Sequence, residues 1–361
     1  MENKSNGNPD SYIDVRNGKI LRPFGPIFFF TKNTKMRVLS LFSGIGGFEV
    51  GFDLANITYD VAGFSEIEPA SIKVYQRHFP SHAPLGDVRD LDFQAIQYDM
   101  IVAGSPCTDI SSAATLRNNK DERGLQGTKS NLFYDFVRAI DTRPTTDFIL
   151  ENVASMKTAT RDKMTEVLQT ASKKPVYMVC LNGAPWTGQA RKRYFWTTWE
   201  VPPQSHVTPV NWQQHLLPTN DAKAFQHSEK AIAYMDRATK GGRTHWEYNH
   251  HHDTHFQAAR TLTAALHKST PINVLIDRRD APPIIRQFAP LEVERLMGFP
   301  DQWTDAICKT KRLKSLGNAV MPQMVEYCMM HYSTRKTNDG GKKKSASQTK
   351  IKQWAPNHPP T

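Results

Sequence analysis

The sequence predicts an α/β protein in which helices cover a parallel sheet and a smaller region is inserted. Apolar strand-like runs alternate with helix-like stretches from residue 36 to about residue 200, as in strands joined by crossover helices. The pattern breaks between residues 202 and 286, which contain Trp, His, Pro and Gly without a sustained period, and it returns from residue 287. A chain of 361 residues is long enough for one full α/β core and one smaller domain.

Five short apolar runs are the expected strands, at residues 38–42, 61–65, 100–103, 148–150 and 176–181. Apolar residues at helical spacing near residues 72–75 and 132–140 indicate helices that pack on this sheet. Two further helices are expected at 291–297 and 322–331. The chain therefore divides into a partly disordered N-terminal extension (1–35), a core (36–201), an insert (202–286), a return to the core (287–332) and a basic disordered tail (333–361).

The charge of the chain favours an extended polyanion as its partner. There are 46 Lys and Arg against 35 Asp and Glu, which gives a net charge of +11. Residues 333–361 alone hold seven basic residues against one acid, a net +6, so the folded part is expected to be only mildly basic. Such a tail either contacts phosphates or is a solvated end, and charge alone leaves both interpretations open.

Cysteine usage and hydropathy predict a reduced, soluble, intracellular chain. Cys107, Cys180, Cys308 and Cys328 have no regular spacing and form no CxxC pair, and Cys180 is expected in a core strand. The N-terminus lacks the apolar stretch of a signal peptide, and no run approaches the roughly 20 apolar residues of a membrane-spanning helix. We therefore expect no membrane partner and no need for disulfides or metal.

A glycine turn, Ser43-Gly44-Ile45-Gly46-Gly47, follows the first expected strand. Glu66 ends the next strand about 20 residues later, where a carboxylate can accept hydrogen bonds from ribose hydroxyls. Asp87 follows a third strand position and suits an adenine amino group. An ordinary strand-to-helix turn and an NAD site are the alternatives, but the turn lacks the GxGxxG order that seats a pyrophosphate. A nucleoside without phosphates fits better.

Reactive side chains follow the later strands. Cys107, in the sequence GSPC, comes after the strand at 100–103, at the carboxyl edge where open α/β sheets bind ligands. A thiol there is a strong nucleophile, although a lone cysteine is more often core filler. Glu151 follows the strand at 148–150 and reaches the same edge. Arg191 and Arg193 alternate along a later strand, so both face one side and could clamp a phosphate or a base oxygen.

In this order and spacing, the motifs resemble the cytosine-5 DNA methyltransferase family along most of residues 36–330. FSGIGG and Glu66 are similar to its cofactor motifs, Asp87 to its adenine contact and GSPC to its nucleophile loop. ENV, QARKR and LGNAV are similar to its glutamate, arginine and final motifs. The resemblance implies a Rossmann-like S-adenosylmethionine-dependent methyltransferase fold with a mixed, mostly parallel sheet. Residues 202–286 would be a small target-recognition region.

The resemblance also implies which residues form the site. The catalytic set is Cys107, Glu151, Arg191 and Arg193. The residues expected to bind S-adenosylmethionine are Phe42, Ser43, Gly44, Ile45, Gly46, Gly47, Glu66, Ile67, Asp87, Val88, Ser105, Asn318 and Val320. In the implied reaction Cys107 adds to carbon 6 of a cytosine flipped out of double-stranded DNA, while Glu151 serves ring nitrogen 3 and Arg191 orients the base. Carbon 5 takes the methyl group, and loss of its proton releases Cys107.

Two departures from many bacterial members indicate a branch of the family. The nucleophile loop reads SPC rather than FPC, and the insert is short, which together with SEIE and RYFW favours the eukaryotic de novo-type catalytic domain.

A tRNA cytosine-5 methyltransferase and an inactive DNA-binding scaffold are the alternatives. The expected location is cytoplasmic and nucleoid-associated in a prokaryotic or viral setting, and nuclear in a eukaryotic one. Target motif, oligomeric state and a restriction-linked, regulatory or self-protective role stay open.

A histidine cluster in the insert is not explained by these motifs. His250, His251, His252 and His255 could suggest a metal site, but no cysteine or carboxylate set with zinc spacing accompanies them. We therefore expect a polar recognition loop and no metal.

Overall fold

The computed structural model describes residues 35–105, 132–205, 207–237, 242, 244, 252–268 and 272–339. Its contacts separate residues 1–35 from a second unit that begins at Met36. Nearly all of the predicted N-terminal extension, the predicted nucleophile Cys107 and the chain after Asp339 therefore lie outside the described residues.

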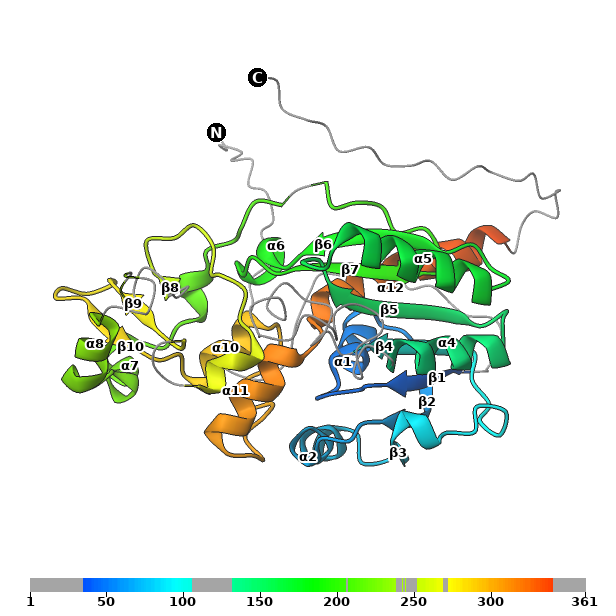
Figure 1. The fold of residues 1–361 in the computed structure, drawn as a ribbon, viewed down its shortest axis with the longest axis horizontal. Coiled ribbons are helices and arrows are strands. Elements are labelled where there is room, and N and C mark those ends of the chain that lie inside the picture. Colours follow the sequence, from blue (N-terminus) through cyan, green and yellow to red (C-terminus); the bar gives the residue numbers. More distant parts are fainter. Residues whose placement is uncertain are drawn as a thin grey trace, which may run out of the picture. The chain divides into compact units, whose positions relative to one another are not determined.

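A seven-stranded sheet forms the centre of the second unit (Figure 1). Its strands are β1 (Met36–Leu41), β2 (Tyr59–Ser65), β3 (Pro84–Gly86), β4 (Met100–Gly104), β5 (Asp147–Val153), β6 (Tyr177–Asn182) and β7 (Lys192–Thr197). They lie in the order β3-β2-β1-β4-β5-β7-β6. The first five are parallel, whereas β7 runs antiparallel to both β5 and β6. The expectation of a mixed, mostly parallel sheet is confirmed.

Helices cover both faces of this sheet, which is why its central strands are apolar on both sides. They are α1 (Gly47–Leu54), α2 (Pro69–His78), α4 (Leu132–Thr142), α5 (Thr158–Ala171) and α12 (Pro322–Asp339). Two further helices, α10 (Pro290–Leu296) and α11 (Lys309–Asn318), pack with the insert instead. Alternate residues of β4 enter different cores. Ile101 and Ala103 pack with residues of α4 and α5, whereas Met100 and Val102 pack with residues of α1 and α12.

The insert is built from short elements rather than long loops, and the short helix α6 (Ala184–Thr187) precedes it. Its elements are α7 (Thr219–Ala222), α8 (Glu229–Met235), β8 (His252–Asp253), β9 (Leu275–Asp277), β10 (Ile284–Arg286) and 3₁₀ turns at Trp212–His215, Lys223–Phe225 and Ala264–His267. The three strands form a second sheet, β10-β9-β8. A third apolar core, containing Trp212, Leu262 and Leu266, joins the insert to α10, α11 and Ile45 of the glycine turn.

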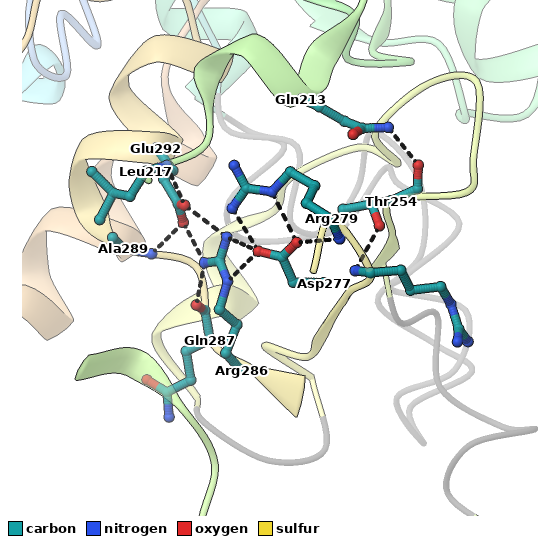
Figure 2. A network of polar contacts seen from close by, with 10 residues as sticks. Gln213, Leu217, Thr254, Asp277, Arg279, Arg286, Gln287, Ala289 and Glu292 are labelled. Carbon is teal, nitrogen blue, oxygen red and sulfur yellow. Dashed lines mark hydrogen bonds and ion pairs between the residues drawn. The ribbon is translucent and has the colours of Figure 1, made fainter. Parts of the chain in front are cut away.

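A buried charge network fixes the small sheet to α10 (Figure 2). Arg286 of β10 donates to Glu292 of α10 through two nitrogens, each at 2.8 Å, and its Nε donates to Asp277 of β9 at 3.0 Å. All three side chains are completely buried. Glu292 also accepts from the backbone N–H groups of Leu217 and Ala289. The network therefore joins β9, β10, the start of α10 and the backbone at Leu217.

Several local expectations need correction. Glu151, Asn152 and Val153 belong to β5 itself, because they continue its pairing with β7. The last helix runs to Asp339, eight residues beyond the predicted end and into the predicted tail. Helix α11 was not predicted, although it carries the first three residues of LGNAV. Cys180 is exposed rather than in the core, because it points to the opposite face of β6 from the buried Val179 and Leu181.

Candidate active site

The parallel strands end along one edge of the sheet, and the strand order reverses there between β1 and β4. Open α/β sheets bind ligands in the crevice at such a switch point. The glycine turn follows β1, Glu66 follows β2, Asp87 follows β3 and Ser105 follows β4. Glu151 lies beside the end of β4, in register with Gly104. The described residues that were predicted from separate motifs are thus brought to one edge.

Glu66 organises the glycine turn through its carboxylate. One oxygen accepts from the Gly44 N–H at 2.9 Å, and the other accepts from the N–H groups of Ile67 and Glu68, both at 2.8 Å. Phe42, at the start of the turn, has a φ of 53°. A left-handed conformation costs a non-glycine residue on the order of 1–3 kcal/mol, and such strain is concentrated at ligand sites. The turn is therefore held in one particular shape.

The neighbouring residues that were predicted to bind the cofactor differ in exposure and in their existing partners. Ile67 is 63% exposed, which is unusual for a large aliphatic side chain, and it lies next to Glu66. Asp87 is paired with Arg89 at 2.5 Å, and hydrogen bonds from Arg89 lower the pKa of Asp87 to about 2. The side chain of Val88 is buried in the core. Ile67 can therefore cover an apolar ring face, whereas Asp87 would have to share its carboxylate with Arg89.

Val320 lies between the glycine turn and the end of β4. A Cβ atom on Gly47 would come within 2.5 Å of the Val320 carbonyl oxygen, and one on Gly104 would come within 2.9 Å of a Val320 methyl group. Both positions therefore require glycine because the final motif packs directly against them. Asn318, from the same motif, is exposed. The structure thus brings the end of LGNAV against the glycine turn.

Glu151 is a buried acid that pairs with the buried guanidinium of Arg193. Its Oε1 lies 2.8 Å from Nε of Arg193, and the two side chains are only 10% and 12% exposed. Burial raises the pKa of Glu151, although the charges of Arg193 and Arg191 oppose this effect. A raised pKa favours the protonated carboxyl group, which can donate a hydrogen bond.

Ser105, which directly follows β4, is fixed beside this acid. The side-chain N–H of Asn152 donates to the Ser105 hydroxyl at 2.9 Å, and Ser105 is 5% exposed. Asn152 follows Glu151 directly, so the buried acid and the residue that binds Ser105 are neighbours on β5. Sequence reasoning included Asn152 within ENV but gave it no role. Cys107 itself lies outside the described residues.

The Arg191 side chain donates hydrogen bonds to backbone carbonyl groups around it. Its guanidinium donates to the carbonyl groups of Leu262 and Ala319, both at 2.8 Å, and of Gly317 at 3.3 Å, and the residue is 1% exposed. Arg191 thereby ties the insert to the final motif. It also lies close enough to Glu151 to influence the pKa of that acid.

Gln189 makes a second connection that sequence reasoning did not assign. Its Oε1 accepts from the Leu262 N–H at 2.9 Å, and its Nε2 donates to the Leu296 carbonyl at 2.8 Å. Gln189 is completely buried. The first residue of QARKR therefore joins the insert to α10, and the signal for it was its place at the head of a motif already singled out.

The histidine cluster is only partly described, since His250 and His251 lie outside the described residues. His252 is buried against the Phe288 ring, with centroids 4.8 Å apart, and His255 is exposed. In the described ranges, no three His, Cys, Asp or Glu side chains are grouped to hold a metal ion. None of the described helices has the length and apolarity to cross a membrane.

The sheet, its switch point and the residues along its edge define an α/β methyltransferase fold. The family model of C-5 cytosine-specific DNA methylases matches residues 36–332. The chain belongs to the C-5 cytosine-specific DNA methylase family.

Two sequence relatives and one solved structure are similar to most of the chain. The type II methyltransferase M1.ScrFI of Lactococcus lactis subsp. cremoris is 26% identical over 310 residues, which cover 80% of this chain and 76% of that protein. The type II methyltransferase M.NlaX of Neisseria lactamica is 27% identical over 305 residues, covering 79% and 92%. The solved structure of the S. pombe Dnmt2 methyltransferase has a TM-score of 0.62 and 16% identity, covering 82% and 97%, which shows the fold. The protein is thus a DNA cytosine-5 methyltransferase.

Proposed function

We propose that the protein transfers a methyl group from S-adenosylmethionine to carbon 5 of a cytosine in double-stranded DNA, through a covalent adduct with Cys107. The observation that carries the proposal is the buried pair of Glu151 and Arg193 beside Gly104 and Ser105. Cys107 follows Ser105 by two positions in the sequence. A nucleophile and an acid would then act on the same small ring.

The cofactor assignment is supported by the turn after β1. Glu66 fixes the Gly44 amide, and the exposed Ile67 supplies an apolar surface beside it. This combination suits a nucleoside, which has a ribose for the carboxylate and a flat ring for the aliphatic side chain. S-adenosylmethionine, when bound, supplies a methyl group on a positively charged sulfur.

The chain's own residues would perform the remaining chemistry. The Cys107 thiolate adds to carbon 6, which breaks the double bond between carbons 5 and 6 and makes carbon 5 nucleophilic. Glu151 donates its proton toward ring nitrogen 3, where negative charge develops, and Arg193 holds the carboxyl group in place. Once carbon 5 is methylated, loss of its proton restores the double bond and expels the Cys107 thiolate. The target must leave the stack, because carbon 6 is inaccessible in a duplex.

A fluorinated substrate tests the covalent step. With fluorine at carbon 5, addition and methyl transfer proceed but elimination cannot, since fluorine does not leave as a cation. We expect a protein–DNA complex that survives denaturation with wild type, and none with Cys107→Ala. Cys180→Ala and Cys308→Ala are matched controls, because both thiols are exposed outside the site. A folded Cys107→Ala protein that still methylates DNA would refute the mechanism.

The substrate and the role need a separate experiment. Incubation with duplex DNA or with tRNA, followed by digestion and nucleoside analysis, should give 5-methylcytosine in the DNA sample. The named relatives are type II methyltransferases. We therefore also propose a restriction-linked role, for which protection of methylated DNA from a cognate endonuclease is the direct assay.

A further inference from the structure

Trp303 contacts the glycine turn from a distant part of the chain. Its indole N–H donates to the Ile45 carbonyl at 2.8 Å, across 258 positions of sequence. Trp303 is 8% exposed and Ile45 only 1% exposed, and both belong to the third apolar core. Because this hydrogen bond is shielded from solvent, it fixes the orientation of the peptide unit between Ile45 and Gly46.

Two aromatic residues at the end of α2 complete the support. The His78 ring stacks on Trp303, with centroids 3.5 Å apart and planes within 4°. The Nε2 of His78 also lies 2.7 Å from the Trp303 carbonyl oxygen. The Phe79 ring fills the space where a Cβ atom of Gly46 would be, at 2.6 Å. Trp303 and Phe79 thus support two successive residues of the same turn.

A buried carboxylate fixes Trp303 in its own loop. Glu294 of α10 is completely buried, and it accepts from the N–H groups of Gln302 and Thr304, both at 2.9 Å, and from the Thr304 hydroxyl. Arg312 of α11 pairs with the same carboxylate at 2.8 Å. The residues on both sides of Trp303 are therefore fixed by one charge. The indole is held rigidly toward the turn rather than simply packed on it.

We propose that Trp303 is a positioning residue for the cofactor, acting through Ile45 on the shape of the glycine turn. The proposal rests on the proposed function, since it takes this turn as the S-adenosylmethionine site. Trp303 has no role in the motif-based assignment of cofactor residues. Removing its N–H should weaken cofactor binding while leaving DNA binding and the chemical step intact.

Trp303→Phe keeps a ring in place and removes the N–H. Loss of one neutral hydrogen bond should raise the Kd for S-adenosylmethionine about fivefold. It should raise the KM for the cofactor similarly, with kcat at saturating cofactor and the Kd for DNA unchanged. Trp199→Phe is the matched control, because the buried Trp199 indole donates to the Cys328 carbonyl at 3.0 Å, away from the turn. The control should lose stability but keep its cofactor affinity.

A measurement on the wild type covers the case in which Trp303→Phe does not fold. Cofactor binding should slow hydrogen exchange in residues 299–308, and leave exchange in α5 unchanged. An unaltered cofactor Kd in folded Trp303→Phe, an equal effect of Trp199→Phe, or no change of exchange in residues 299–308 would overturn the proposal. Wild-type protein that does not bind S-adenosylmethionine at all would refute the cofactor assignment itself, and this inference with it.

Discussion

Arg193 Nε lies 2.8 Å from Glu151 Oε1 at the carboxyl edge of the sheet, and both side chains are almost fully buried. The two residues lie on the neighbouring antiparallel strands β5 and β7, where Glu151 is in register with Phe195 and Arg193 with Val153, so the pair is diagonal. The pairing of these strands brings distant sequence motifs together. Glu151 is thus an acid whose protonation depends on two opposing effects, burial and a fixed positive charge. This balance leads to a prediction about pH.

The methylation step should require protonated Glu151 and should slow as pH rises through its raised pKa. Glu151→Gln cannot transfer a proton, so we expect its single-turnover rate to fall about 10²- to 10⁴-fold and to lose this alkaline decrease. Arg193→Met removes the charge that opposes burial, so its decrease should move to higher pH. Glu166→Gln, an exposed acid on α5, is the control. An unchanged pH profile in Glu151→Gln would remove Glu151 from the proton-donating role.

Glu66→Ala should weaken S-adenosylmethionine binding at least tenfold, as measured by calorimetry. The sequence predicted that Glu66 binds only the ribose of the cofactor. In the structure its carboxylate also accepts hydrogen bonds from three backbone N–H groups. Hydrogen bonds to a charged group contribute about 1.5–3 kcal/mol, so the variant should also unfold at slightly lower denaturant concentration. Glu200→Ala, at an exposed position, should change neither quantity. Full cofactor affinity in the Glu66 variant would contradict the assignment.

Sequence reasoning worked best where burial dictates residue type. Strands β1, β4 and β5 are covered on both faces, so they are continuous apolar runs that stand out from their surroundings. Because parallel strands end at one edge, the expected positions of Glu66 and Glu151 near the ends of their strands are enough to place both there, although Glu151 is part of β5 rather than after it. The strand positions and the shared edge of these two residues are confirmed, whereas their chemical roles stay predictions.

Features that depend on distant contacts could not be predicted. Helix α11 is rich in lysine and buries few apolar residues, so its helical period is weak in the sequence. The partners of Arg191 are backbone carbonyl groups 71 to 128 residues away, which no local pattern encodes. Cys180 lies on the exposed face of β6, and a strand's own composition does not show which of its faces another element covers.

Arg286→Met should destabilise the protein by about 3–5 kcal/mol, because it leaves the buried Asp277 and Glu292 without their shared cation. Arg286→Lys should recover only part of this, since one ammonium group cannot replace a guanidinium that pairs with both carboxylates. Denaturant unfolding measures the change. Lys163→Met, which breaks an exposed pair with Glu166, should cost less than about 1 kcal/mol. Equal effects of the two variants would show that the network in Figure 2 does not stabilise the insert.

Deleting residues 340–361 should lower DNA affinity and its dependence on salt. Helix α12 runs to Asp339, so the deletion begins there rather than at residue 333 as the sequence suggested. The removed segment carries five lysines and no acid. For every phosphate that the shortened chain no longer neutralises, the slope of log affinity against log salt should become shallower by about 0.9. A tail of equal length with the five lysines changed to glutamine should behave like the deletion, whereas an unaltered slope would identify a solvated end.

Glu49 provides a test of how a buried acid affects stability. It is 1% exposed on α1, where its carboxylate accepts from the Tyr75 hydroxyl at 2.8 Å, and burial raises its pKa above the usual value. Tyr75 in turn lies 3.0 Å from Nδ1 of His82. Below pH 4.5 both the folded and the unfolded chain keep the Glu49 proton, so the residue contributes no pH dependence.

Above that pH the unfolded chain releases the proton first, so the folded state binds more protons and its stability falls as pH rises toward the folded pKa. Glu49→Gln keeps an oxygen for Tyr75 but cannot ionise, so its stability should fall less between pH 5 and 8 than that of wild type. Urea unfolding at several pH values measures the difference, in which the titration of His82 cancels because both proteins contain it. Glu166→Gln should run parallel to wild type, since that acid is exposed. If Glu49→Gln also runs parallel, Glu49 titrates normally and the buried acid is not a source of pH sensitivity.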